Sequence, residues 1–403
     1  MQQIENVTIG IDWEILVNSQ NTGLSAGKER ILQIISEAKR KLPDLEVGED
    51  IDLLEVRLGM TSDFAELWEK SHRAFETCSK LAARKKATLV PLGYREADYN
   101  PAGGHVHAGS MQNYIDTAEL HNRLLPFVPA LISIASSSPS LDGRTRSQRI
   151  KMNAHHCSNP MTPMDPERSL HLWGTDVCVK YPYKPTLELR AADSQPIPAM
   201  VCEIAALYAG LASGLSRRDK PVFKSDVLQY GLNRINAARN GMRATFRMGD
   251  SEITASEIIA EYILPIAVDG LNDYGAPDGP FAIAETMVRN RISIADWVET
   301  LVPSGTDPFR AVGELTRIFS VGVDPVGWIA RQKPRQAAPF IGPEDDFLEA
   351  VAIDTPIHHV YEALPLPRSY IESMAEDFEK AGKIRRRKGK RNEFRLDRTD
   401  LLQ

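Results

Sequence analysis

The sequence has few cysteines and no long uninterrupted apolar run. Its four cysteines are widely spaced and form no Cys-x-x-Cys pair: Cys78, Cys157, Cys178 and Cys202. This spacing argues against a disulfide framework and a thiolate zinc site, and we expect buried, inert thiols. No apolar run approaches the roughly 20 residues of a membrane span, and the N-terminus MQQIENVTIG lacks the features of a signal peptide. We therefore expect a cytoplasmic protein.

The chain as a whole has no excess of positive charge. The 403 residues carry a formal net charge of -6, which argues against a protein built throughout to bind nucleic acid. The exception is KIRRRKGKRNEFRLDR, residues 383 to 398, with nine Lys or Arg and two acidic residues. This asymmetry indicates a separate C-terminal module.

Hydrophobic patterns predict a mixture of strands and helices. Alternating, β-rich stretches at 6–17, 52–59, 103–110 and 185–193 indicate strands. Residues 62–86 predict a long helix with Ser62 as its N-cap, and residues 198–215 are apolar all round, which predicts a buried helix. Residues 222–332 indicate a run of helices, while 139–175 is too polar and irregular for regular elements. We expect one large domain over 1–332, a Pro-containing linker over 333–345 and a small module over 346–403.

Four of the predicted strands carry pairs of polar residues spaced two apart. Residues two apart on a strand point to the same face of the sheet, so each pair is aimed at one place. The pairs are Asp12 with Glu14, Glu55 with Arg57, His105 with His107, and Glu188 with Arg190.

A charged sheet face is expensive to bury, because each unpaired interior charge costs several kcal/mol. A hard divalent cation would neutralise this one: carboxylates from Asp12, Glu14, Glu55 and Glu188 with one imidazole suit Mg²⁺ or Mn²⁺. The arginines suit phosphate oxygens or a substrate carboxylate. Any single pair is also typical of a solvated sheet face, and the histidines alone of a hydrogen-bonded loop. The four pairs together favour the cation site because their chemistry is consistent.

The order of these motifs resembles the glutamate-cysteine ligase type 2 family, within the glutamine synthetase-like superfamily of ATP-dependent carboxylate-amine ligases. GGHVHAG is similar to the family's Gly-x-His-Val-His segment, and YKPTLELRAAD to its Pro-Thr-x-Glu-x-Arg strand. TIGIDWEILV and LLEVRLG resemble its two acidic strands, and LISIASSSPSLDGRTRSQR and NRINAARNGM resemble later segments. The resemblance extends from about residue 6 to about residue 332.

The resemblance implies an α+β fold, in which a twisted antiparallel sheet backed by helices binds ATP and Mg²⁺ on its concave face. It implies that His107 lies near the nucleotide phosphates and that Arg190 stabilises the transferring phosphoryl group. It also implies that Arg149 and Arg239 contact phosphate or the substrate carboxylate, with Arg149 as a catalytic residue and Arg239 as a cofactor-binding residue. The implied metal ligands are Asp12, Glu14, Glu55, His105 and Glu188.

The implied function is ATP-dependent ligation of an amine onto a small-molecule or peptide carboxylate through an acyl phosphate, with release of ADP. Glutamate and cysteine are the family default. The chain departs from the family at two places. Asp12 stands where the family has Glu and is one methylene shorter, which we expect to affect the position of one metal ion or the strength of its binding. The loop LDGRTRSQR replaces the family's Asp-Thr-Gly-Tyr run, which leaves the substrates open. We expect a homo-oligomer. The alternative is a nucleic-acid-binding regulator whose ligase-like body senses a metabolite.

Residues 355 to 396 have the order of a winged helix: a short helix, a turn at LPLP, a longer helix ending at Gly382, and two strands around RKGKRN. Such a basic hairpin could bind nucleic-acid phosphates, dock on an acidic partner, or simply be solvated. One short basic hairpin is a weak signal, so nucleic acid is not the favoured partner. His155 and His156 are adjacent, so in an extended chain they point opposite ways and do not indicate a shared site.

Overall fold

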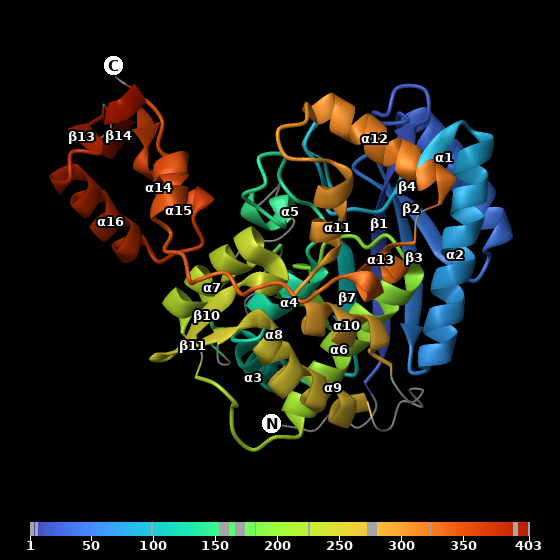
Figure 1. Cartoon of the computed structure of the whole chain (residues 1–403). Helices are drawn as coiled ribbons and strands as arrows, with labels where there is room; N and C mark the ends of the chain where they lie inside the picture. Colours follow the sequence, from blue (N-terminus) through green and yellow to red (C-terminus); the bar gives the residue numbers. More distant parts are fainter. Residues whose placement is uncertain are drawn as a thin grey trace.

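A computed structural model describes residues 4, 7–97, 100–152, 161–165, 174–181, 183–224, 226–271, 280–322, 324–389 and 394–401 (Figure 1). Its centre is a seven-stranded sheet in which every neighbouring pair of strands is antiparallel. The prediction of an antiparallel sheet backed by helices is therefore confirmed. The strand order is β2 (Glu46–Asp50), β3 (Leu53–Thr61), β1 (Ile9–Ser19), β7 (Gly104–Ala108), β9 (Leu187–Leu189) and β8 (Val177–Val179), with β4 (Ala87–Val90) pairing with the second half of β1.

The odd-numbered side chains of β1 form the apolar face of the sheet. Ile11, Trp13 and Ile15 are buried in the core, and Trp13 stacks on Phe75 with ring centroids 5.4 Å apart. Phe75 belongs to α2 (Phe64–Arg84), which lies with α1 (Lys28–Lys41) along this face in Figure 1. The predicted N-cap of α2 is wrong by one residue, because Asp63 accepts the backbone N–H groups of the first turn.

Helix α6 (Pro198–Ser216) is buried on nearly every side, as its apolar sequence predicts. It is long and apolar enough to cross a membrane by length and composition alone, but 94% of that apolar window is buried within the protein. Close packing against α9 (Leu264–Leu271) requires glycine at one contact, since a Cβ on Gly210 would lie 2.5 Å from the Ala267 carbonyl oxygen.

The predicted run of helices after residue 222 is confirmed, with one interruption. The strands β10 (Thr245–Met248) and β11 (Ser251–Thr254) form a hairpin within it. One short helix, α5 (Gln148–Lys151), lies in the segment predicted to be irregular. The other helices of the body are α3 (Tyr114–Leu124), α4 (Val128–Ala135), α7 (Val227–Asn240), α8 (Ala255–Ile258), α10 (Ala282–Asn290), α11 (Ile294–Leu301), α12 (Pro308–Val321) and α13 (Pro325–Arg331).

The C-terminal elements have an apolar cluster of their own and lie to one side of the body in Figure 1. Phe347, Val360 and Leu396 belong to this cluster, which also contains Leu232 and Ile235 of α7. The module therefore packs on α7. Its elements are α14 (Glu344–Ala350), β12 (Thr355–Pro356), α15 (Ile357–Ala363), α16 (Arg368–Lys380), β13 (Ile384–Lys388) and β14 (Phe394–Arg398), with strand order β12-β14-β13.

Candidate active site

One cavity of about 290 Å³ opens on the polar face of the sheet. Strands β1, β3, β7 and β9 each contribute one of the polar pairs that the sequence singles out. The structure therefore brings the four pairs together. The lining consists of Asp12, Glu14, Asp50, Glu55, Arg57, His105, His107, Val179, Lys180, Tyr183, Lys184, Glu188 and Arg190.

Strand register explains why these side chains meet. Asp12 lies opposite Arg57 of β3 on one side and opposite His105 of β7 on the other. On β9, Glu188 lies opposite His107. Cross-strand partners on one face have Cβ atoms about 5 Å apart, so antiparallel pairing converts separate sequence motifs into one cluster.

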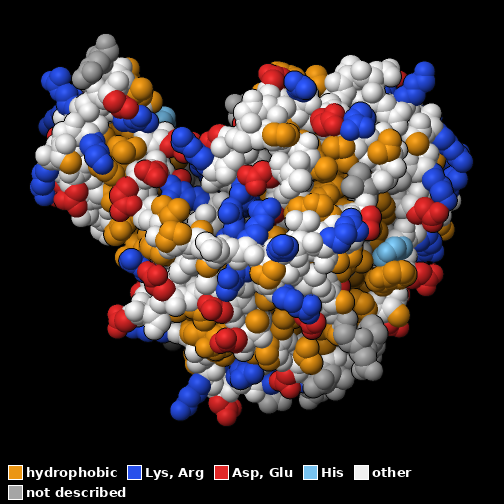
Figure 2. Space-filling model, viewed as in Figure 1, with side chains coloured by type: hydrophobic (Ala, Val, Ile, Leu, Met, Phe, Trp, Pro, Cys, Tyr) orange, Lys and Arg blue, Asp and Glu red, His pale blue; other side chains and the backbone are white. Residues whose placement is uncertain are grey.

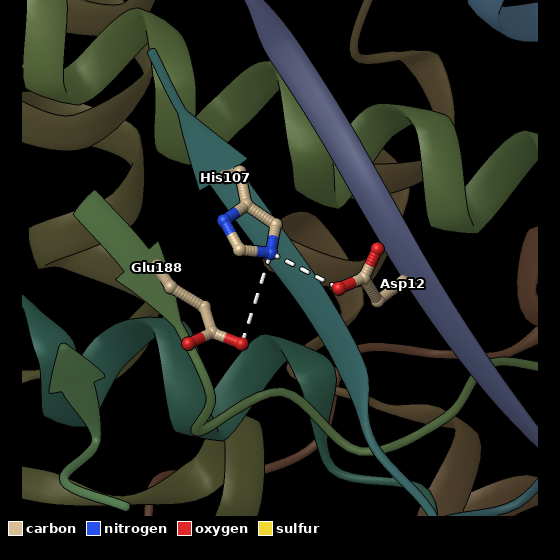
Figure 3. Close-up of side chains that lie close together, drawn as sticks. All are labelled: Asp12, His107 and Glu188. Atoms are coloured by element: carbon tan, nitrogen blue, oxygen red, sulfur yellow. Dashed lines mark hydrogen bonds and ion pairs between the residues drawn. The ribbon is translucent and has the colours of Figure 1, made fainter. Parts of the chain in front are cut away.

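His107 lies between two carboxylates (Figure 3). Its Nε2 is 3.2 Å from Asp12 Oδ2 and 3.7 Å from Glu188 Oε1. One donor atom from each of these residues lies within 4.8 Å of the others, a grouping that can hold a metal ion. The other ring nitrogen, Nδ1, is 3.2 Å from Thr186 Oγ1, which orients the imidazole. Two carboxylates and one imidazole form a donor set that suits a divalent cation.

His105 has different surroundings. Its Nε2 is 3.2 Å from the Arg149 guanidinium, which can only donate, so Nε2 accepts and the ring proton of the neutral imidazole lies on Nδ1. Nδ1 is 3.6 Å from Glu14 Oε1 and 3.7 Å from Glu188 Oε1. Burial, followed by the charges of Arg190 and Arg149, keeps the pKa of His105 well below its usual value. Of the two histidines, His107 therefore has the better geometry for a cation.

Glu188 lies among positively charged side chains. Lys180 Nζ lies 2.6 Å from its Oε2, and an Arg190 guanidinium nitrogen lies 2.9 Å from its Oε1. Burial would raise the pKa of Glu188, but Arg190, His107 and Lys180 outweigh burial and lower it. In the same cavity, Arg57 pairs with Glu55 at 2.7 Å. The carboxylates therefore have local counterions.

Glu14 is the acid whose charge is least compensated. Its side chain is 4% exposed, and burial raises its pKa to about 7 although Arg149 and the Gly103 N–H oppose this shift. Burial also acts on Asp12, but the hydrogen bond from His107 and the nearby positive charges bring the pKa of Asp12 below its ordinary value. Glu14 thus gains most from an added cation.

The two remaining predicted residues lie elsewhere. Arg149 is fully buried on α5 and does not line the cavity. It donates to the Arg190 carbonyl at 2.8 Å and contacts His105 from behind. Arg239 is not brought to the cavity at all: it pairs with Asp346 of α14 at 2.8 Å and donates to the Gly342 carbonyl at 3.1 Å. Its surroundings are those of a contact between the body and the module.

The sequence analysis missed Lys180, which follows the three-residue strand β8. It also missed Arg234 of α7, which is 2% exposed and binds the Asp176 carboxylate with two nitrogens, at 2.6 and 3.0 Å. The Asp176 carbonyl accepts the Arg190 N–H at 2.8 Å, and Arg234 donates to the Ile150 carbonyl beside Arg149. Arg234 therefore supports the backbone of both active-site arginines. A charged residue between apolar positions of a helical pattern was the available signal.

The three cysteines that the structure describes do not line this cavity. Cys78, Cys178 and Cys202 are buried and free, and burial raises the pKa of both Cys78 and Cys202 to about 12. The expectation of inert thiols is confirmed for these three. His155, His156 and Cys157 lie outside the described residues.

No protein-family model and no curated protein sequence matches the chain. Solved structures do match. One is a glutamate-cysteine ligase from Francisella tularensis in complex with AMP, with a TM-score of 0.50 and 10% identity over 94% of this chain and 95% of that chain. Another is PafA, the ligase of the prokaryotic ubiquitin-like protein Pup, with a TM-score of 0.47 and 14% identity over 98% of this chain and 88% of that chain. This chain has the overall fold of the glutamate-cysteine ligase structure.

Proposed function

We propose that the protein is an ATP-dependent carboxylate-amine ligase. The γ-phosphoryl group of ATP passes to a carboxylate, an amine attacks the resulting acyl phosphate, and an amide, ADP and phosphate leave. The observation that carries this proposal is the meeting of two histidines, five acids and Arg190 in one cavity of a fold shared with glutamate-cysteine ligase.

Asp12, His107 and Glu188 are the residues that would hold Mg²⁺ or Mn²⁺, given the close grouping of their donor atoms. Bound there, the ion would neutralise phosphate charge. Glu14 and Glu55 also line the cavity and offer carboxylates for a further ion. This assignment differs from the one that the family resemblance implies, in which His105 is the cation ligand. Here His107 is the cation ligand, and His105 links Arg149 to Glu14 and Glu188.

The arginines divide between contact and support. Arg190 lines the cavity with its side chain 18% exposed, so it can meet the transferring phosphoryl group and stabilise the charge that develops there. Arg149 is buried behind His105 and is a positioning residue in this proposal. Phosphoryl transfer asks a protein mainly for positioning and charge neutralisation, which these residues supply.

The substrates that we propose are a small-molecule or peptide carboxylate and an amine, with glutamate and cysteine as first choices because of the resemblance to the type 2 family. We further propose a cytoplasmic homo-oligomer and a winged-helix C-terminal module. The module's order of helix, strand, two helices and two strands supports this classification. Nucleic acid is not the partner that we favour, because hairpin arginines such as Arg387 are paired with acids.

The test is a screen of ADP release with Mg²⁺ against amino acids, singly and in pairs, followed by hydroxylamine trapping with the active acid. We expect ADP and a hydroxamate from the native protein and from Glu252→Gln, whose side chain is exposed on β11. We expect neither from Glu188→Gln. Release of AMP and pyrophosphate, or undiminished turnover in Glu188→Gln, would contradict the proposal.

A further inference from the structure

A second, larger cavity of about 720 Å³ lies where the body meets the C-terminal module. Its walls come from the 143–145 loop, the ends of α5 and α7, the linker, α14 and Arg398. It shares no lining residue with the candidate active site. Figure 2 shows Lys and Arg side chains gathered in the hollow beside the module.

Four buried polar atoms on residues that line this cavity have no hydrogen-bond partner among the described residues. One of them, Asp346 Oδ2, forms an ion pair with Arg239. The other three have no such partner within the described ranges. They are Thr145 Oγ1, Asn240 Nδ2 and Arg243 Nε, and each can donate a hydrogen bond. Leaving a buried donor without an acceptor destabilises the folded protein. Three such donors around one polar cavity indicate an occupant that accepts hydrogen bonds.

In the part of the chain that the structure describes, five basic and three acidic residues line the cavity, and one of the basic residues has no acidic partner. Lys151 pairs with Glu349 at 2.8 Å, and Arg239 pairs with Asp346 at 2.8 Å. Arg243, in contrast, forms no ion pair within 4.0 Å among the described residues. Burial first, and then the nearby Arg146, lower the pKa of Arg243.

The positive charge of Arg243 has no acidic partner in the described part of the chain because the nearby acids pair with other arginines. Asp296 pairs with Arg335 at 2.7 Å and with Arg146 at 3.4 Å, and Arg146 also pairs with Glu299 at 3.1 Å. A bound anion would therefore relieve repulsion between guanidinium groups as well as satisfy the unpartnered donors.

We infer that this cavity binds a small phosphate-bearing anion. A phosphate group combines about 1.5 to 2 negative charges near neutral pH with several acceptor oxygens, so it suits a cavity lined by Thr145, Asn240 and Arg243. Arg144, whose side chain is 80% exposed, lies at the edge of the same cavity and adds charge. This site is independent of the proposed ligase reaction.

The short helix α5 lies between the two cavities and has residues near both of them. Arg149 of this helix is fully buried against His105, whereas Lys151 lines the phosphate cavity. Because of this proximity, the experiment must separate phosphate bound at Arg243 from phosphate bound at Arg190. The source of the ligand is separated by testing inorganic phosphate and a simple phosphate ester in parallel.

The experiment is isothermal titration of the metal-free full chain with sodium phosphate, and in a second arm glycerol phosphate, at ionic strength held constant with chloride. We expect Arg243→Met to weaken phosphate binding about tenfold or more, which corresponds to about 1.4 kcal/mol. Thr145→Val, nearly isosteric, should weaken it less and guards against misfolding of the first variant. Arg289→Met, exposed on α10 outside the cavity, is the matched control and should bind normally.

Arg190→Met should retain this binding, because Arg190 lines the other cavity. Equal phosphate affinity in the native, Arg243→Met and Thr145→Val proteins would overturn the inference. So would loss of binding in Arg190→Met alone, since the phosphate would then belong to the candidate active site. Tighter binding of inorganic phosphate or of glycerol phosphate shows whether the ligand is free phosphate or a phosphate ester.

Discussion

Two regions of this protein concentrate charge, and they differ in burial. In the sheet cavity, Glu14, His107 and Glu188 are at most 5% exposed. In the C-terminal hairpin, Arg385, Arg387 and Lys388 are exposed on β13. Charge in water is inexpensive and needs no special explanation, whereas charge in an interior requires a compensating group. The buried cluster is therefore much stronger evidence of chemistry than the more conspicuous basic run.

The pairing of the charges supports this contrast. In the hairpin, Arg387 Nε lies 2.8 Å from the Asp397 carboxylate, and Arg395 lies 2.6 Å from Asp354. Arg387 and Asp354 are exposed in these pairs, so the charges of the hairpin are compensated locally and their arginine side chains remain in contact with water. In the cavity, the pKa values of Glu14 and His105 move far from their ordinary values, which is typical of functional sites.

The largest effect that we predict is on the cavity. Asp12→Asn should weaken Mn²⁺ binding and reduce turnover by about 10²–10³-fold, because the amide removes a charged ligand from the group around His107. Electron paramagnetic resonance of Mn²⁺ measures the first effect without any assumption about substrate. Asp250→Asn, an exposed acid in the β10–β11 turn, is the control and should change neither. Unchanged Mn²⁺ affinity in Asp12→Asn would remove the difference between the two regions.

The second effect concerns stability and pH. The carboxyl of Glu14 has an ordinary pKa of 4.5 in the unfolded chain and one of about 7 in the metal-free folded protein. Between these values the unfolded chain has released the proton and the folded protein retains it, so stability falls as pH rises. Above pH 7, the free energy of unfolding is about 3 kcal/mol lower than at pH 4 because of the Glu14 carboxyl group.

Glu14→Gln should therefore be equal to the native protein at pH 4 and more stable at pH 8, by denaturant unfolding in chelator. Saturating Mg²⁺ should reduce this gain, because a cation stabilises the native carboxylate. Glu203→Gln is a matched control: burial also raises the pKa of Glu203 to about 7, but Glu203 caps α10 outside the cavity, so Mg²⁺ should not change its gain. If Mg²⁺ left the gain in stability at pH 8 unchanged in both variants, Glu14 would not lie near a bound cation.

The sequence predicted the polar face of the sheet because strand alternation is local. Two residues spaced two apart, such as His105 and His107, must share a face wherever the strand lies. It could not predict which carboxylates each histidine approaches, because that depends on the register between β1, β7 and β9 and on the irregularity between Gly10 and Asp12.

Two further positions depend on the packing of distant segments. Lys180 lines the cavity and directly follows β8. This strand has only three residues, which is too short for an alternating pattern to be recognised in the sequence. Arg239 was assigned from a motif, but the side of α7 on which it lies is covered by the C-terminal module, where Asp346 pairs with it. Packing between distant segments, rather than local propensity, decided both positions.

The smallest effect that we predict is on the hairpin. Replacing Arg385, Arg386 and Arg387 by Ala should change the slope of log affinity against log salt, for duplex DNA and for RNA, by less than about 1. The reason is that phosphates would compete with carboxylates already in place: Arg387 with Asp354 and Asp397, and Arg386 with Glu376 at 3.9 Å.

The matched control is the triple Ala variant of Lys39, Arg40 and Lys41, an exposed basic run in the last turn of α1. Fluorescence anisotropy of both variants and the native chain across a salt titration gives the slopes. Equal, weak binding by all three leaves the hairpin as a solvated or docking surface. A slope reduced by about 2–3 only in the hairpin variant would mean that these arginines neutralise phosphates, and exposed charge would then be functional in this protein alongside buried charge.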